Sequence, residues 1–348
     1  MEHSKFVHLH LHTDFSLLDG ANDIGALMKE AEAKKMPAIA MTDHGNLFGA
    51  ISFYETAMHH GIKPIIGCEL YVAKGARTER SSSEGEKANH HLTVLATSDE
   101  GYRNLVTLVS TAYLDGFYYR PRVDKELLSK HHRGIIALSG CLNGEVESKL
   151  QGEQDQAALE VAGQWQDIFG KENFFLEIQD HGLEKQRFVN PRLVALSKRL
   201  EVPLVATNDC HYLRRDDSRA HDILLCIGTG STVNDSSRMR YETDQFYLKS
   251  DVEMLASFQE IPEAVHRTVE IAERCHFKLE KIASPFPRFD VPEGQSLEEY
   301  FDRVVREGFA ERAIHLPLGL QHHRAHCPGE SHLHSLGAQS GTMTDTKI

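Results

Sequence analysis

The stretch FVHLHLH, residues 6–12, alternates three histidines with apolar residues. Alternation with a period of two is typical of a strand, in which side chains two residues apart share one face. The imidazoles of His8, His10 and His12 are therefore expected to point the same way. A buried face must satisfy their ring nitrogens, and neutral imidazole is the commonest metal ligand. The stretch predicts a strand that carries a metal site, and a histidine-decorated edge strand is the alternative.

Outward from this strand, short apolar runs alternate with longer amphipathic segments as far as residue 212. Such alternation predicts βαβ units around a parallel sheet, and about seven units favour closure into a barrel over an open sheet. The expected strands are 6–12, 37–42, 64–66, 70–73, 92–97, 134–139, 173–178 and 203–207. The expected helices are 24–35, 48–60, 100–112, 157–169 and 184–200, and the polar segment 75–89 is expected to be a surface loop.

Beyond Tyr212 the pattern becomes mainly helical, with expected helices at 218–227, 251–257 and 262–276. We expect a barrel over about 5–212 and a helical extension over 213–283, together one domain over 1–283. Prolines at 285, 287 and 292 indicate a linker, so 284–312 would lead into a further module.

The segment 313–348 differs in composition from the rest of the chain, since its only acidic residues are Glu330 and Asp345 and it has no aromatic residue. Such a tail is not expected to pack a core. A histidine-rich metal tract is one interpretation, and a reading-frame or gene-end artefact is the favoured one. No function is therefore given to its histidines, at positions 315, 322, 323, 326, 332 and 334.

The overall composition limits the classes of protein and of partner. The chain has 348 residues, of which 41% are hydrophobic and 26% charged, with a net charge of −13. These values exclude a disordered, collagen-like or disulfide-stapled class, and any nucleic-acid contact must be local or metal-mediated. The sequence contains no apolar run of membrane-spanning length, no secretory signal pattern and no CxxC pair among its six cysteines. We therefore expect a cytoplasmic protein with reduced thiols.

Ligand-type residues follow several of the expected strands, at the edge where a parallel barrel gathers its active-site residues. They are Asp19, Asp43, His44, Cys68, Glu69, Cys141, Asp209 and His211. Nitrogen, carboxylate and thiolate donors together favour zinc, manganese or iron over magnesium. So many donors imply two or three ions, an arrangement suited to phosphoester hydrolysis. The sequence holds no GxSxG, GxxxxGK[ST] or strand-linked GxGxxG motif that would indicate other chemistry.

At these residues the sequence resembles the PHP (polymerase and histidinol phosphatase) family. The matching segments, within residues 6–230, are HLHLHTDFSLLDGAN, MTDHGNLFGAISFY, KPIIGCELYVA, FYYRPRVDKELL, LSGCLNGEV, FFLEIQDHG and VATNDCHYLRRDDSRAHDILLCIGTG. The HxH and DxH pairs mark the family in general. Segments 46–54, 120–124 and 217–230 resemble more narrowly the PHP domains of the α subunits of bacterial replicative DNA polymerases.

The resemblance implies an α/β fold, a distorted (β/α)7 TIM-like barrel with a mainly helical C-terminal extension, holding up to three divalent ions. The implied ligands are His10, His12, Asp19, His44, Glu69, His91, Cys141, Asp209 and His211. His91 is preferred to His90 because it adjoins the strand. Catalytic roles are expected for His44, Glu69, Asp209 and His211.

Further residues are expected around these ligands. His8, Asp43, Glu177 and His181 would support the ligands or line the mouth of the site, although helix capping is an equal alternative for Glu177 and His181. The guanidinium groups of Arg120 and Arg122 would hold backbone phosphates, or else would form structural ion pairs.

The intact ligand set favours a metal-dependent 3′→5′ exonuclease, or a related phosphoesterase, acting on the 3′ end of a DNA primer. One alternative is a catalytically silent scaffold that docks a separate proofreading exonuclease, and another is a stand-alone phosphatase of the histidinol-phosphate type. The family's polymerases continue into palm, thumb and fingers and join other replicase subunits. We expect this chain to be a truncated fragment that lacks the catalytic aspartates of the palm and does not itself polymerise DNA.

Overall fold

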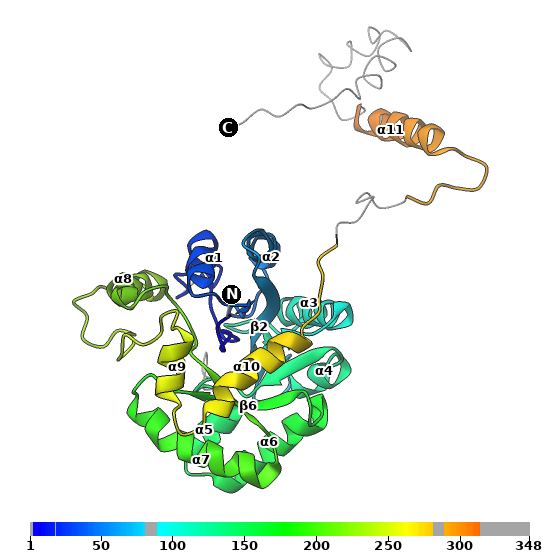
Figure 1. Ribbon diagram of the computed structural model, residues 1–348. Coiled ribbons are helices and arrows are strands. Elements are labelled where there is room, and N and C mark those ends of the chain that lie inside the picture. Colours follow the sequence, from blue (N-terminus) through cyan, green and yellow to red (C-terminus); the bar gives the residue numbers. More distant parts are fainter. Residues whose placement is uncertain (1–2, 18, 81–88, 281–288, 314–348) are drawn as a thin grey trace. The chain divides into compact units, whose positions relative to one another are not determined.

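The computed structural model describes residues 3–17, 19–80, 89–280 and 289–313 (Figure 1). The chain divides into two compact units, Met1–Glu280 and Lys281–Ile348. Within the described part of the second unit lies one long helix, α11 (Leu297–Ala313). The segment 314–348, with the tail histidines, lies outside the described residues. No helix in the described ranges is long and apolar enough to cross a membrane.

The first unit is built on a seven-stranded mixed sheet. Its strands are β1 (Ala38–Met41), β2 (Lys63–Ala73), β3 (Asn89–Ala96), β4 (Arg122–Val123), β5 (Ile135–Leu138), β6 (Phe174–Gln179) and β7 (Leu204–Thr207). The order is β1-β2-β3-β5-β6-β7, with β4 paired to β2. The runs 64–66 and 70–73, expected as two strands, form the single strand β2.

The prediction of a fully parallel sheet is wrong at β3, which runs antiparallel to both β2 and β5. Parallel neighbours need a crossover, usually a helix, whereas antiparallel neighbours need only a loop. Between β2 and β3 lies the polar segment 74–88, whose sequence has no helical pattern. Such a connection suits antiparallel neighbours, whereas β5 is parallel to β6 and β6 to β7.

Helices surround the sheet (Figure 1). They are α1 (Ile24–Ala33), α2 (Ala50–His59), α3 (Asp99–Leu114), α4 (Lys125–Lys130), α5 (Glu145–Gln151), α6 (Asp155–Phe169) and α7 (Glu184–Leu200), followed by α8 (Ser218–Thr229), α9 (Asp251–Ser257) and α10 (Pro262–Arg274). Side-chain caps from Asp23, Ser98 and Asp124 start α1, α3 and α4, because each accepts a hydrogen bond from an otherwise unpaired first-turn N–H. The apolar faces of the helices, including Phe53 of α2 and Trp165 of α6, form the larger hydrophobic core of the unit.

The histidine-rich segment 6–12, expected as a strand, forms only an isolated bridge at Leu11, which pairs with Cys210. It nevertheless closes the sheet, because it lies between β1 and the residues that follow β7. On one side the N–H groups of Ala40 and Thr42 donate to the carbonyls of His8 and Leu11, at 2.9 and 2.8 Å. On the other side His12 N–H donates to Cys210 O at 2.8 Å, and Cys210 N–H donates to His10 O at 3.1 Å. The two edges are thereby joined, and the predicted distorted α/β barrel is confirmed.

The same segment contains a bulge that the alternating sequence conceals. The acceptors His8 O and Leu11 O are three residues apart, whereas their donors on β1 are two residues apart. One extra residue therefore stands in the segment and interrupts the alternation of faces. The His8 ring contacts the Lys249 carbonyl, with 2.9 Å between Nε2 and O, and packs on Phe6. The expectation that His8 shares a face with His10 and His12 is wrong, and so is its supporting role at the site.

The barrel interior has an apolar floor beneath a polar layer. Helix α10 crosses one end of the barrel (Figure 1). The floor there consists of Val7, Leu9, Ala38, Ala40, Ile65, Leu95, Ile136, Leu138, Phe175 and Val205, closed by Ile271 and Ala272 of α10 and by Cys275 just after it. On the same strands, two or four residues from these floor residues and nearer the opposite end of the barrel, the inward face carries polar side chains. They are Glu69, His91, Glu177 and Thr207. The polar layer therefore lies at the carboxyl ends of the parallel strands.

Candidate metal centre

The structure brings all the expected ligands together in the polar layer. His10 and His12 lie within 4 Å of the carboxylates of Glu69 and Asp209. The remaining ligands line a cavity of about 220 Å³ above them, namely Asp19, His44, Glu69, His91, Cys141, Asp209 and His211. They come from strand ends and from the loops that follow, because the carboxyl ends of the strands meet at this end of the barrel.

The Glu69 carboxylate lies at the centre of the cluster and is only 1% exposed. Its Oε1 is 2.7 Å from His91 Nδ1 and 3.5 Å from His10 Nε2. Its Oε2 is 2.5 Å from His44 Nδ1. The Cys141 sulfur lies 3.8 Å from Glu69 Oε1 and 3.7 Å from His91 Nδ1. One carboxylate thus faces donors from four other segments, as a bridging ligand would.

The Asp209 carboxylate faces His10 and His12, the two histidines that follow the bulge and point into the barrel. Its Oδ1 is 3.3 Å from His10 Nε2 and 3.1 Å from His12 Nε2. The backbone of Asp209 is left-handed, with φ of 43°, an uncommon conformation for a residue with a side chain. The neighbouring peptide is anchored, since the His181 ring donates from Nε2 to Asn208 O at 3.0 Å.

A third carboxylate, Asp19, completes the cluster on the α8 side. It lies 3.0 Å from His44 Nε2 and 3.8 Å from His211 Nε2. The other nitrogen of His211, Nδ1, donates to the Asp209 carbonyl at 2.7 Å. The backbone carbonyl of Asp19 is held by the ring of His221 at 2.8 Å.

Within the described ranges, three groups have ligand atoms close enough to share an ion: His12–His44–His211, His10–His12–Glu69 and Glu69–His91–Cys141. Buried atoms of the cluster also lack a hydrogen bond of acceptable geometry. They are His10 Nε2, His12 Nε2, Asp19 Oδ1, His44 Nδ1, Glu69 Oε2 and Asp209 Oδ1. Buried polar atoms without partners are costly, and coordination of a cation would satisfy all of these. The residues present therefore fit divalent metal ions.

The electrostatics favour a cation at the same place. Burial opposes ionisation of Glu69, but His91 and His44 hold the pKa of that carboxyl well below its usual range. His10 and His211 similarly lower the pKa of Asp209 against the effect of burial. Burial, and repulsion from His44 and His211, lower the pKa of His12 to about 3. Ionised carboxylates thus stand beside the neutral ring of His12. Against the effect of burial, nearby carboxylates raise the pKa of His10 and of His44 well above the ordinary value, so these two rings release a proton when a metal ion binds.

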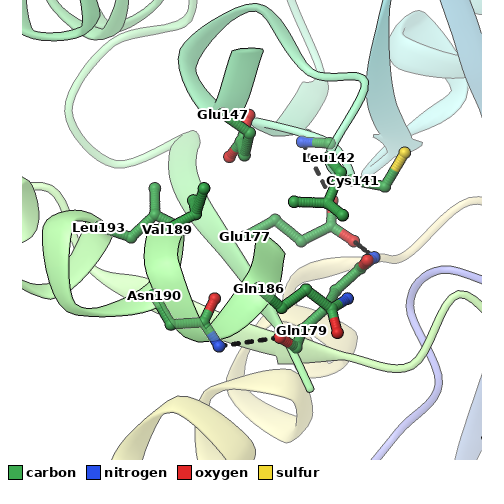
Figure 2. A pocket seen from close by; sticks show the side chains of 10 residues that line it. Cys141, Leu142, Glu147, Glu177, Gln179, Gln186, Val189, Asn190 and Leu193 are labelled. Atoms are coloured by element: carbon green, nitrogen blue, oxygen red, sulfur yellow. Dashed lines mark hydrogen bonds between the residues drawn. The ribbon is translucent and has the colours of Figure 1, made fainter. Parts of the chain in front are cut away.

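Glu177 lies beneath the ligands and orients one of them. It is 1% exposed and accepts the Nδ1–H of His10, with 2.6 Å between the heavy atoms. The Gln179 amide donates to the same carboxylate at 3.0 Å (Figure 2). The Gly140 N–H donates to it at 3.1 Å, and the Thr207 hydroxyl is a further donor. In the neutral ring this arrangement places the lone pair of His10 on Nε2, on the side of Glu69 and Asp209. Such a carboxylate–histidine pair is typical of metal sites.

The other expected supporting residues have distinct surroundings. Asp43 is fully buried and accepts hydrogen bonds from Thr13 and from Ser16, whose hydroxyl is 3.1 Å from His12 Nδ1. His181 is bonded at both ring nitrogens, to Gln186 and to Asn208, and burial lowers its pKa to about 4. It therefore anchors the backbone before Asp209 as a neutral ring.

The two arginines differ. Arg122 is 2% exposed, and its guanidinium donates to the carbonyls of Gly116, Arg77 and Glu79 at 2.7–3.1 Å. Its guanidinium also lies 5.1 Å from the centroid of the Tyr118 ring. The expectation that Arg122 holds a phosphate is wrong, because its hydrogen bonds tie down backbone within the protein. Arg120 instead lies over the Tyr71 ring at 5.8 Å, and that ring is 5.2 Å from the ring of His91.

The sequence analysis missed residues that reach the cavity from the segment between α8 and α9. Met239, Tyr241 and Phe246 line the cavity, and the Tyr241 hydroxyl is 3.0 Å from His211 Nε2. Burial and nearby carboxylates raise the pKa of Tyr241 well above its ordinary value, so the phenol keeps its proton. The segment has no periodic pattern, and a tyrosine in it carries no signal of its own.

Glu147 of α5, a carboxyl that no sequence pattern marked, faces a small cavity beneath the 139–144 loop (Figure 2). Burial raises its pKa well above the ordinary value, against an opposing hydrogen bond from Ser139, and Glu177 raises it further. Its neutral form is therefore favoured by folding. The associated stability is complete below the unfolded pKa near 4.5 and is lost as pH rises through the folded pKa.

At pH values between the unfolded and the folded pKa of Glu147, we expect the Glu147→Gln variant to become more stable relative to the wild type as pH rises. The difference in free energy of unfolding should grow by about 1.4 kcal/mol per pH unit. Urea unfolding of both proteins at pH 5, 6 and 7 measures the difference. Glu126→Gln, at a surface position, should show no such slope. A constant difference between Glu147→Gln and the wild type at the three pH values would contradict the prediction.

Comparisons with known proteins agree with this geometry. The PHP domain family matches residues 8–181. DNA polymerase III subunit alpha of Treponema pallidum is 45% identical over 313 residues, which are 90% of this chain and 27% of that protein. The same subunit of Thermus aquaticus is 45% identical over 319 residues, 88% of this chain and 26% of that protein. The chain thus spans about a quarter of the length of these relatives.

Solved structures resemble the chain more distantly. A two-domain protein from Bacteroides vulgatus, described as containing a predicted PHP-like metal-dependent phosphoesterase, shares 16% identity with a TM-score of 0.34. The match covers 59% of this chain and 52% of that one, and a likeness this weak adds nothing to the assignment. The assignment rests on the family match and the relatives: the chain belongs to the PHP domain family and, over nine-tenths of its length, is similar to part of DNA polymerase III subunit alpha.

Proposed function

We propose that this chain is the PHP domain of a replicative DNA polymerase and that it hydrolyses phosphodiesters, as a metal-dependent 3′→5′ exonuclease. The observation that carries the proposal is the convergence of buried, unpartnered donor atoms around Glu69. The similarity of the chain to DNA polymerase III subunit alpha supports a DNA 3′ end as substrate and replicase subunits as partners. The domain would comprise residues 1–283, and the other parts of the polymerase would supply nucleotide transfer.

The proposed roles follow from the contacts. His10, His12, Asp19, His44, Glu69, His91, Cys141, Asp209 and His211 would hold two or three ions, with zinc, manganese or iron suited to the mixed donors. Bound divalent ions supply positive charge for phosphate oxygens and make water a stronger nucleophile at neutral pH. Glu69 and Asp209 would bridge neighbouring positions, because each faces imidazoles on two sides.

The surroundings of the ligands would position the substrate. Asn143 and Gln179 line the cavity and carry amide groups that can donate to phosphate oxygens. Leu142 and Phe246 supply apolar walls that limit access of bulk water. Arg120, beside Tyr71, would add a cation near the mouth. With a net charge of −13, the chain would rely on this local site for contact with DNA.

The test uses the full chain, freed of metal and reloaded with Mn²⁺ or Zn²⁺, on 5′-labelled primer–template DNA. We expect stepwise shortening from the 3′ end that requires metal and falls to background in the His10→Ala/His12→Ala double variant. His59→Ala/His60→Ala is the matched control, since it removes two neighbouring histidines of α2 and its C-terminus that lie outside the centre.

The two alternatives give different results. Metal binding without hydrolysis of any DNA end would overturn the nuclease proposal and favour a scaffold that docks a separate exonuclease. Hydrolysis of small phosphomonoesters with intact DNA would instead favour a phosphatase of the histidinol-phosphate type.

A further inference from the structure

Tyr241 makes an unusual contact with one of the proposed ligands. Its hydroxyl lies 3.0 Å from His211 Nε2. The other ring nitrogen of His211, Nδ1, faces the Asp209 carbonyl at 2.7 Å and must carry the proton, because a carbonyl accepts only. In the neutral ring, the form in which an imidazole binds metal, Nε2 therefore holds the lone pair, and the tyrosine hydroxyl is then the donor.

That lone pair is also the one a metal ion would use. His211 belongs with His12 and His44 to a group whose ligand atoms lie close enough to share an ion. An imidazole nitrogen offers a single lone pair in the plane of its ring, so it cannot accept the Tyr241 hydrogen and bind a metal at the same time. The Tyr241 hydrogen bond and a metal ion on His211 Nε2 therefore exclude each other.

The Tyr241 ring is held so that its hydroxyl stays at the cavity. The ring packs on Phe246 and His221, with centroids 4.4 and 4.9 Å apart. It lines the cavity of the centre and also a neighbouring cavity bounded by Tyr212, His221 and Asp222. The packing fixes the phenol oxygen, but the hydroxyl hydrogen can rotate. When His211 no longer accepts it, the hydroxyl is therefore available to donate to another acceptor in the cavity.

We propose that Tyr241 is a substrate-binding residue: its hydroxyl caps His211 in the metal-free protein and, once His211 Nε2 is taken, donates to a non-bridging oxygen of the phosphate. This proposal rests on the proposed function, since it assigns the phosphate contact at the same site. It predicts that the oxygen-bound hydrogen of Tyr241 affects metal binding and phosphate binding in opposite directions. The hydroxyl opposes metal binding and favours phosphate binding.

The experiment compares wild type with Tyr241→Phe in the full chain, because phenylalanine keeps the ring packing and removes the hydroxyl. Calorimetric titration of the metal-free proteins with Mn²⁺ or Zn²⁺ gives metal affinity, and titration of the loaded proteins with inorganic phosphate gives phosphate affinity. A neutral hydrogen bond corresponds to about a 2- to 12-fold change in affinity. We expect Tyr241→Phe to bind metal tighter and phosphate weaker, each by a factor in that range.

Tyr247→Phe is the matched control, since its hydroxyl lies on the same segment but contacts Glu253. Both affinities should be unchanged in it. Any other pattern in Tyr241→Phe, including a purely structural loss of both affinities, overturns the proposal. If the wild type cleaves DNA and the phosphate affinity of Tyr241→Phe is normal, only this proposal fails. If the loaded wild type neither cleaves DNA nor binds phosphate, the proposed function fails and this proposal with it.

Discussion

Removal of divalent metal from the full chain with a chelator is expected to lower its melting temperature by about 10 °C. The carboxylates of Glu69, Asp209 and Asp19 each have a buried oxygen atom without a hydrogen-bond partner. Because a metal ion binds this cluster only in the folded protein, its binding free energy adds to stability. An ion held at 1,000 times its dissociation constant adds about 4 kcal/mol, and 1 kcal/mol shifts the melting temperature of a domain this large by about 2–4 °C.

Circular dichroism at 222 nm, recorded during heating, measures the effect before chelation, after it and after metal is restored. The His10→Ala/His12→Ala variant should show little response to the chelator, whereas His59→Ala/His60→Ala should respond as the wild type does. Equal melting temperatures for chelated and loaded wild type would show that the cluster gains its stability without an ion, from the ion pairs between its imidazoles and carboxylates.

The place of the site could be predicted from the sequence because it depends on a rule of topology. Parallel strands gather their carboxyl ends at one end of a barrel, so residues that follow separate strands meet there even when they are far apart in the chain. The alternation of side chains along a strand likewise places His90 and His91 on opposite faces of β3. On β3 the positions 91, 93 and 95 share the inward face, and His91 accordingly lies 2.7 Å from Glu69.

The errors arise where a local irregularity or a distant contact decides the outcome. One extra residue between His8 and Leu11 changes which side chains face inward, and nothing in the alternating letters marks it. Arg122 is engaged by carbonyls of the segment around residue 77, a contact across more than 40 residues that no motif encodes. The Tyr241 contact with His211 is of the same kind, because a loop without periodicity brings it to the cavity.

Glu177→Gln is expected to weaken metal binding by about 10- to 100-fold, although glutamine has almost the same shape. The carboxylate accepts from His10 and Gln179 through Oε1 and from Gly140 through Oε2. An amide offers only one acceptor oxygen, so either orientation of the substituted side chain places its NH₂ group against a donor. His10 then loses the partner that fixes its tautomer, or the loop carrying Cys141 loses an anchor.

The loss of one buried hydrogen bond also predicts a fall of about 1–3 kcal/mol in the free energy of unfolding of the metal-free protein. Calorimetric titration with Mn²⁺ or Zn²⁺ gives the affinity, and urea unfolding after chelation gives the stability. Glu172→Gln, an exposed change just before β6, should alter neither quantity appreciably. If Glu177→Gln loses stability but keeps its metal affinity, the carboxylate only supports the loop, and the orientation of His10 does not limit binding. If both the stability and the metal affinity fall, Glu177 is assigned to the metal centre, because a purely structural role would leave the metal affinity of the folded protein unchanged.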